Sequence, residues 1–244
     1  MREAGAVPAT IGVLDGDIRV GLEEHELERF TEDARKVGPR DLAAAAAQGV
    51  VGATTVGGTL AVARNVGIRF MGTGGIGGVH RDPRDVSPDV YELARTTALV
   101  VSSGAKSLLD VPATAELLET LGVPALGYRT DTLPLFYSAS GGPPVSARVD
   151  TPTEAARVAQ AHWELGGAGL LLGRAPTESV DDVEPLIAEA LQLAAAQGVG
   201  GQLLTPFVLG HLHRGSGGRT LEANRQLVAD NAALAAEVAV AFGR

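Results

Sequence analysis

Residues 98–110 read Ala-Leu-Val-Val-Ser-Ser-Gly-Ala-Lys-Ser-Leu-Leu-Asp, an apolar run that breaks into small residues just before a single lysine, Lys106. The run predicts a buried strand, and open α/β sheets bind their ligands beyond the carboxyl ends of strands. Apolar neighbours would desolvate the ammonium of Lys106 and lower its pKa, so that some free amine can attack an aldehyde carbon. On this segment alone, a solvated lysine opening a helix is the commoner outcome, by about two to one. The segment therefore predicts a sheet and a candidate nucleophile.

The rest of the chain alternates short strand-like runs with alanine-rich helical patterns. Asp15-Gly16 between two β-branched runs predicts a hairpin, and Thr151-Pro-Thr-Glu154 predicts the start of a helix. Residues 23–33 are expected to form an exposed acidic helix. Further strands are expected at 68–71 and 169–172, and further helices at 57–65, 183–197 and 221–242. Helices between buried strands predict one α/β domain over residues 1–244, a three-layer α/β/α fold whose largely parallel mixed sheet has helices on both faces.

Composition excludes several classes of function. The chain has 244 residues, 45% of them hydrophobic, and a net charge of −9, which disfavours binding to nucleic acid because that affinity depends on a basic surface. It has no cysteine, which excludes disulfides, thiolate metal sites and a cysteine nucleophile, and we expect a cytoplasmic protein. No apolar run approaches the roughly 20 residues that a membrane span needs, so no membrane association is expected.

A glycine-rich segment, Gly72-Thr-Gly-Gly-Ile-Gly-Gly-Val-His80, follows the strand expected at 68–71. Gly72, Gly74 and Gly77 match the spacing of a dinucleotide-binding turn, but polar residues follow instead of a helix, so we reject that interpretation. Exposed backbone N–H groups favour a loop that binds a phosphate or a sugar. A tight crossing of backbones is the alternative, at about one chance in four.

Acidic residues after this segment predict a site for a hard cation. Asp82, Asp85 and Asp89 lie close to His80 in the sequence, and carboxylate oxygens suit Mn²⁺ or Mg²⁺ better than zinc. Without other observations, solvated carboxylates are the commoner outcome by about three to one.

Seven separated segments, in order and spanning nearly the whole chain, resemble the pseudouridine-5′-phosphate glycosidase family, to which indigoidine-cluster proteins are closely related. The segments are residues 5–11, 36–42, 52–56, 72–81, 104–107, 205–207 and 230–232. The resemblance implies reversible cleavage of a C–C glycosidic bond, which gives uracil and ribose 5-phosphate. It also implies one Mn²⁺ ion per subunit and a homotrimer. Lys106 stands where family members carry the lysine that attacks C1′ of the ribose and forms an imine.

The resemblance also assigns the remaining candidate residues. Ligand contacts are implied for Lys36, Val56, Ser87, Pro88 and Asp89, pocket positions for Thr73, His80 and Asn231, and the metal ligand for Asp85. The loop after His80 is shorter than in the family, so Asp82 is the alternative metal ligand. Lys36 would bind the 5′-phosphate.

Three departures from the family pattern bear on activity. Family members carry an upstream strand whose glutamate donates a proton, and we expect this sequence to lack it, because residues 1–8 resemble the last turn of a helix capped by Gly5. Either the start codon is assigned too late or the protein is naturally truncated. Gly38-Pro39 replaces the usual Ser-Arg, and residues 173–176 lack the expected Asn-Pro. Two alternatives therefore stand beside the glycosidase: a catalytically impaired homologue that binds a sugar phosphate, and a lysine-dependent enzyme acting on a related sugar phosphate.

Overall fold

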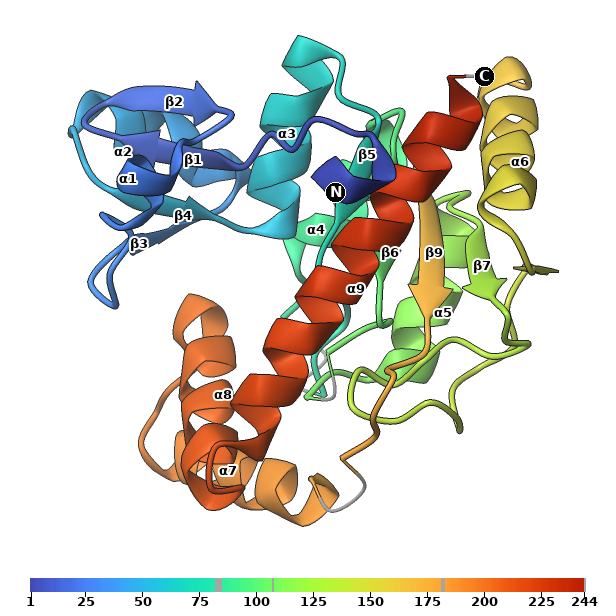
Figure 1. Cartoon of the computed structure of the whole chain (residues 1–244). Coiled ribbons are helices and arrows are strands. Elements are labelled where there is room, and N and C mark those ends of the chain that lie inside the picture. Colours follow the sequence, from blue (N-terminus) through green and yellow to red (C-terminus); the bar gives the residue numbers. More distant parts are fainter. Residues whose placement is uncertain (82–84, 107, 181–182, 244) are drawn as a thin grey trace.

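The computed structural model describes residues 1–81, 85–106, 108–180 and 183–243 (Figure 1). Within these residues the strands form two sheets. The larger sheet has the order β5 (Phe70–Gly72), β6 (Leu99–Ser102), β9 (Leu170–Arg174), β7 (Ala125–Tyr128) and β8 (Ala147–Val149), and all its pairings are parallel. The smaller sheet has the order β2 (Asp17–Val20), β1 (Ile11–Leu14), β4 (Gly52–Thr54) and β3 (Arg35–Val37), and it is mixed.

Helices connect and cover the strands. They are α1 (Glu24–Leu27), α2 (Leu42–Ala47), α3 (Val56–Val66), α4 (Pro88–Arg95), α5 (Val111–Thr120), α6 (Pro152–Glu164), α7 (Glu184–Ala196), α8 (Leu204–Gly215) and α9 (Arg219–Phe242). The long helix α9 crosses the molecule beside the larger sheet, and α7 and α8 form a hairpin at its amino-terminal end (Figure 1). No helix of the described residues is long and apolar enough to span a membrane.

Strand β6 shows why the larger sheet is sandwiched between helices. Leu99 and Val101 pack on one face with buried residues of α6 and α9, whereas Val100 packs on the other face with buried residues of α4 and α5. Successive side chains of a strand point to opposite faces, so a continuously apolar strand needs helices on both sides. The predicted three-layer arrangement is confirmed for this sheet.

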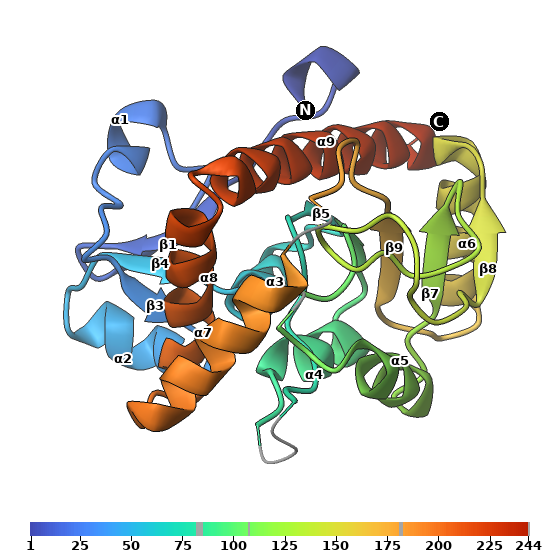
Figure 2. The same cartoon turned by 90° about the horizontal axis from the view of Figure 1, so that it is seen from below.

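The first four strands form a sheet of their own, which the sequence pattern did not separate from the rest. Asp15 and Gly16 have φ of 53° and 92°, so the predicted hairpin between β1 and β2 is confirmed. Val13 and Val37 pack under α2 and α3 in a separate apolar cluster. The smaller sheet lies to one side of the larger sheet in both views (Figures 1 and 2).

The predicted acidic helix at 23–33 is wrong, because the chain is helical only over α1. Phe30 lies so close to Gly12 of β1 that a β-carbon on that glycine would come within 2.7 Å of the phenyl ring. The chain therefore leaves the helix to cover the hairpin. The helix predicted after Thr151 is confirmed as α6, and the Thr151 hydroxyl accepts the N–H of Glu154 at 3.2 Å. Gly5, with φ of 85°, ends a short 3₁₀ turn over Arg2–Ala4, as expected.

Two loops leave the adjacent carboxyl ends of β5 and β6. We call residues 73–81 the glycine loop and residues 103–110 the lysine loop. Ile76 pairs with Ala105 and His80 pairs with Leu109, so the two loops run side by side. The sheet thereby places the glycine-rich segment directly against Lys106.

Candidate active site

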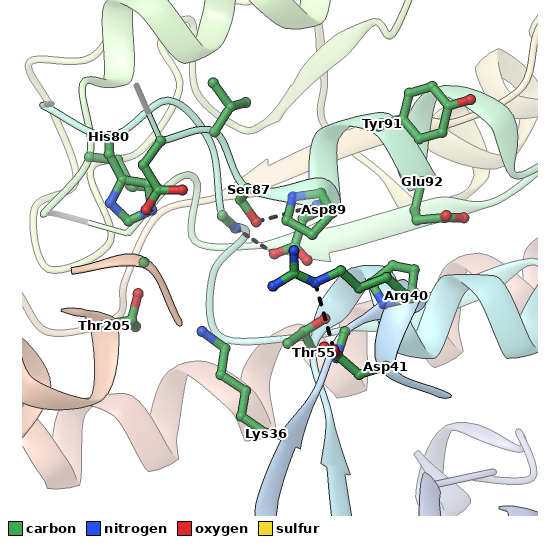
Figure 3. A pocket seen from close by; sticks show the side chains of 18 of the residues that line it. Lys36, Arg40, Asp41, Thr55, His80, Ser87, Asp89, Tyr91, Glu92 and Thr205 are labelled. Carbon is green, nitrogen blue, oxygen red and sulfur yellow. Dashed lines mark hydrogen bonds and ion pairs between the residues drawn. The ribbon is translucent and has the colours of Figure 1, made fainter. Parts of the chain in front are cut away.

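A cavity of about 750 Å³ lies between the two sheets. Its wall combines Lys36 of β3, Thr55 before α3, Gly77 of the glycine loop, Lys106 of the lysine loop and Thr205 of α8. The first residues of α4 complete the wall. The Lys36 side chain extends toward the side where Thr205 and His80 lie (Figure 3). Segments from at least six parts of the chain therefore meet at the place predicted from the lysine loop.

The distribution of lysine in the chain is informative. The sequence contains two lysines, Lys36 and Lys106, and both line this cavity. The other 18 of its 20 basic residues are arginines. A guanidinium keeps its proton in proteins, whereas a lysine can lose its own when buried and act as a nucleophile. The cavity therefore holds every side-chain amine of the chain.

The surroundings of Lys106 lower its pKa. Burial is the largest cause, the Asp89 carboxylate opposes it, and the positive charge of Lys36 adds to it. The backbone is fixed as well, because Lys106 N–H donates to the Ile76 carbonyl at 3.2 Å. The side chain is partly exposed and faces the cavity. The structure thus holds a lysine whose pKa lies below its ordinary value, which raises the fraction of free amine.

The glycine-rich segment, residues 72–80, packs closely against neighbouring elements. A β-carbon on Gly72 would come within 2.5 Å of the Ala232 Cα in α9, and one on Gly75 within 2.5 Å of the Phe136 ring. The N–H groups of Ile76 and Gly77 already donate to the Gly104 carbonyl at 3.1 Å and to an Asp89 oxygen at 2.9 Å. Close packing therefore explains glycine at positions 72 and 75, and the binding of a phosphate or a sugar by this loop stays a prediction.

Three residues implied as ligand contacts or pocket positions, Thr73, Val56 and Asn231, are not among the described residues that line the cavity. Asn231 is fully buried in α9 and donates to the Thr73 carbonyl at 2.7 Å and to Ser103 Oγ at 3.1 Å, so both it and Thr73 hold the glycine loop from behind. Val56, the first residue of α3, packs in the apolar core, whereas its neighbour Thr55 caps the helix and lines the cavity. The ligand contacts implied for these residues stay predictions.

The remaining implied residues do line the cavity. Ser87 caps α4, Pro88 opens it, and Asp89 follows in its first turn. The Asp89 carboxylate is 4% exposed and accepts the N–H groups of Gly57 at 2.7 Å and Gly77 at 2.9 Å. Its hydrogen bonds therefore go to the protein backbone (Figure 3).

The candidate metal ligands lie at the same wall. His80 Nε2 is 3.6 Å from Asp85 Oδ2, and the imidazole is 8% exposed whereas the Asp85 side chain is 38% exposed. No group of three or more acidic or histidine side chains is placed to hold a metal among the residues that the structure describes. Asp82 lies outside those residues. Asp85 and His80 thus offer one carboxylate and one imidazole, a partial donor set to which water would have to add.

Comparison with known proteins assigns the chain to a family. Residues 1–241 match the family described as indigoidine synthase A like protein. The chain belongs to this family. The family resemblance found in the sequence is confirmed.

Relatives with assigned activities cover almost all of the chain. The pseudouridine-5′-phosphate glycosidases of Streptomyces griseus and Thermus thermophilus are each 48% identical to it, over 99% of this chain and over 78% and 87% of their own lengths. A solved structure of an indigoidine synthase A-like protein from Thermotoga maritima is 40% identical, with a TM-score of 0.92 over 100% of this chain and 83% of that one.

A second solved structure in the family carries a ligand. It is the prealnumycin C-glycosynthase AlnA in complex with ribulose 5-phosphate, and it is 45% identical to this chain. The TM-score is 0.89, over 99% of this chain and 83% of that one. The fold predicted from the sequence is therefore the fold of this family.

Sequence reasoning missed several cavity residues. Thr205 belongs to one of the family-like segments, but nothing local connects it with Lys36. Glu92 is 2% exposed and binds Arg64 at 3.0 Å and Arg95 at 2.6 Å. The spacing of Glu92 and Arg95, three residues apart on one helix, is a signal that could have revealed this pair. Arg95 also lies under the ring of Tyr91, 5.0 Å from its centroid.

Proposed function

We propose that this protein is a pseudouridine-5′-phosphate glycosidase, which reversibly converts pseudouridine 5′-phosphate and water into uracil and ribose 5-phosphate. The observation that carries the proposal is the desolvated Lys106 at the wall of a cavity shared with Lys36. Relatives 48% identical over nearly the whole chain bear that name. A carbon leaving group has to be expelled by an electron donor at C1′, and an amine bonded to C1′ donates its lone pair for this purpose.

The proposed reaction has three steps. The free amine of Lys106 attacks C1′ and the ring oxygen leaves with a proton, which opens the ribose. The nitrogen lone pair then forms a C1′=N bond while the C1′–C5 bond breaks, and C5 of uracil takes up a proton. Water adds to the iminium carbon, releases ribose 5-phosphate as an aldehyde and returns Lys106. Atoms balance, and the electron pair of the broken bond ends in the C–H bond of uracil.

The phosphate would be bound by Lys36. Its ammonium lies across the same cavity and provides a positive charge for the 5′-phosphate. Binding at a point remote from C1′ holds the sugar in position for attack, which contributes several kcal/mol to lowering the barrier. The charge of Lys36 also lowers the pKa of Lys106. Lys36 would therefore both bind the phosphate and increase the fraction of free amine at Lys106.

Release of uracil from pseudouridine 5′-phosphate, measured by liquid chromatography, tests the proposed function. Uridine 5′-phosphate is the matched control, because it is an isomer with an N-glycosidic bond. Pseudouridine without phosphate tests the contribution of Lys36. We expect uracil from the first compound alone. Tight binding of pseudouridine 5′-phosphate without uracil release would favour the impaired homologue that binds a sugar phosphate.

A related activity is the second candidate, and one comparison favours it. AlnA is a C-glycosynthase in complex with ribulose 5-phosphate and is 45% identical to this chain. The chain would then join or split a C-glycosidic bond between a pentose phosphate and another acceptor. Borohydride trapping with ribose 5-phosphate and ribulose 5-phosphate in parallel separates the two candidates, because the preferred sugar reacts at the lower concentration.

We further propose that Asp85 binds a Mn²⁺ ion and that water molecules fill the remaining coordination positions of the metal. Bound there, Mn²⁺ would neutralise negative charge on the substrate phosphate. Asp85→Asn should weaken Mn²⁺ binding by about 10-fold or more, because it removes the charged ligand. The electron paramagnetic resonance signal of free Mn²⁺ measures the affinity. Asp110→Asn, at the cap of α5, is the control, and equal affinities in the two variants would contradict the assignment.

We also propose that the protein forms a homotrimer in the cytoplasm, as the family resemblance implies. Light scattering coupled to size-exclusion chromatography measures the mass of the assembly directly.

A further inference from the structure

Arg40 is a second basic residue of the cavity wall, four positions after Lys36 in the sequence. It is the middle residue of the 3₁₀ turn Pro39–Asp41, between β3 and α2, and its side chain is 80% exposed. The two terminal nitrogens of its guanidinium point into the cavity, toward the side on which the Lys36 ammonium lies (Figure 3). Two cationic groups from one short segment therefore face the same space.

The position of Arg40 is fixed from behind. Asp41 Oδ2 accepts the N–H of Gly38 at 3.1 Å, which ties the carboxylate to the backbone, and Asp41 Oδ1 lies 3.6 Å from Nε of Arg40. Pro39 packs against the first turn of α3, since a β-carbon on Gly57 would lie 3.1 Å from Cγ of the proline. The turn is thus held against α3, and the pairing through Nε directs the other two nitrogens to the cavity.

The negative charge of the proposed substrate exceeds what the Lys36 side chain alone can balance. A phosphate monoester carries about −1.5 to −2 charges near neutral pH, and Lys36 contributes one positive charge. Lys106 reacts as the neutral amine, so it contributes no charge in the reacting state. Arg95 of the same wall already donates to Glu92 at 3.0 and 2.6 Å. Arg40 is the remaining arginine among the described residues that line the cavity.

A guanidinium can recognise a phosphate in a way that an ammonium cannot. Its terminal nitrogens form a planar fork, which binds two oxygens of one phosphate at the same time, whereas a lysine acts as a point charge. A sugar without phosphate offers neither the charge nor the pair of oxygens. A fork at this place in the cavity would therefore distinguish ribose 5-phosphate from ribose.

We propose that Arg40 determines specificity for the 5′-phosphate: its two terminal nitrogens bind two phosphate oxygens, and Lys36 supplies the second positive charge. The inference rests on the proposed function, because it takes a sugar phosphate as the ligand. It adds a residue to which the family resemblance assigned no contact. Since Gly38-Pro39 stands where family members carry Ser-Arg, Arg40 alone supplies a guanidinium from residues 36–42.

Borohydride trapping with ribose 5-phosphate and with ribose, run in parallel, isolates the contacts to the phosphate. Arg40→Met removes the guanidinium and keeps an unbranched side chain, so the half-saturating concentration of ribose 5-phosphate should rise about 100-fold. Arg40→Lys keeps the charge without the fork, and the rise should be about 10-fold. The rate of trapping with ribose should stay within about twofold of the parent in both variants, because ribose carries no phosphate.

Arg35→Met is the matched control for the loss of one positive charge. Arg35 precedes Lys36 in β3, donates to Gln48 at 2.7 Å and is not among the described residues that line the cavity. Its substitution should leave the half-saturating concentration within about twofold of the parent. An equal change for both sugars in Arg40→Met, or no change for ribose 5-phosphate, would overturn the inference. The same holds if the effect of Arg40→Met disappears when a chelator removes Mn²⁺, because the guanidinium would then act only through the metal.

Chemical modification gives a second readout, which needs neither an adduct nor a variant. Phenylglyoxal reacts with exposed guanidinium groups, and peptide mass spectrometry follows the modification of Arg40 in the parent. We expect ribose 5-phosphate to protect Arg40 and ribose to give no protection, whereas Arg35 should react equally in all samples. Modification of Arg40 at the same rate with and without ribose 5-phosphate would overturn the inference. If the parent forms no adduct, the proposed function fails, and this protection still decides the role of Arg40, as it does if Arg40→Met does not fold.

Discussion

Lys106→Ala should form no reduced adduct with ribose 5-phosphate and borohydride, and should release uracil at least about 1,000-fold more slowly than the parent. The reason is that the proposed reaction depends on an amine bonded to C1′. The other lysine, Lys36, lies in the same cavity but its positive charge is expected to bind the phosphate. No other side chain of the protein is a primary amine.

Peptide mass spectrometry makes this measurement unambiguous, because an adduct can form only on Lys36, Lys106 or the amino terminus. Lys106→Arg is the matched control. It keeps a positive charge and a long side chain, yet a guanidinium does not form the imine. We expect both variants to lose the adduct while circular dichroism shows an intact fold. An adduct on Lys36 in the parent would contradict the assignment of the nucleophile.

Gly104→Ala should lower the free energy of unfolding by about 3 kcal/mol or more, and it should also abolish adduct formation. Gly104 has a φ of 85°, and a β-carbon there would overlap the carbonyl oxygen of Pro134. Backbone meets backbone at this point, so no side chain can move aside to make room. The displaced segment carries Lys106 two residues later and pairs with Leu135. Urea denaturation measures the stability, and trapping measures the position of the amine.

Gly122→Ala is the control. It measures the cost of a positive φ at a position where an added β-carbon meets no other atom. Gly122 has a φ of 69°, but a β-carbon there would meet no atom within 4 Å. This control should cost about 1 kcal/mol and should leave trapping unchanged. Equal losses of stability in the two variants would mean that the overlap with Pro134 does not determine the cost.

The parts of this protein that could be predicted from sequence are those fixed by local chemistry. Strand β6 is apolar on both faces, so its burial and the helices that cover it follow from Leu99, Val100 and Val101. Lys106 follows that strand directly, and its place at the cavity follows from the general rule for carboxyl ends of parallel strands. Asp15-Gly16 specifies its own turn.

Features that depend on pairing between distant segments could not be predicted in this way. The separation of the first four strands into a second sheet depends on β1 pairing with β4, which lies far along the chain. Asp89 looked like a loop carboxylate, and its role depends on Gly57 and Gly77 reaching it from other elements. The close contacts of Gly72 and Gly75 likewise depend on Ala232 and Phe136, which lie far along the chain.

The confinement of lysine to the cavity wall gives the protein an unusual pattern of proteolysis. A protease that cuts only after lysine has two sites in the whole sequence, one in β3 of the smaller sheet and one in the loop that follows β6 of the larger sheet. Cleavage at either site requires the backbone to leave its present pairing, with β4 at Lys36 and with the glycine loop at Lys106. The digest therefore reports on access to the cavity, and a bound ligand would be recognised by the survival of the intact chain.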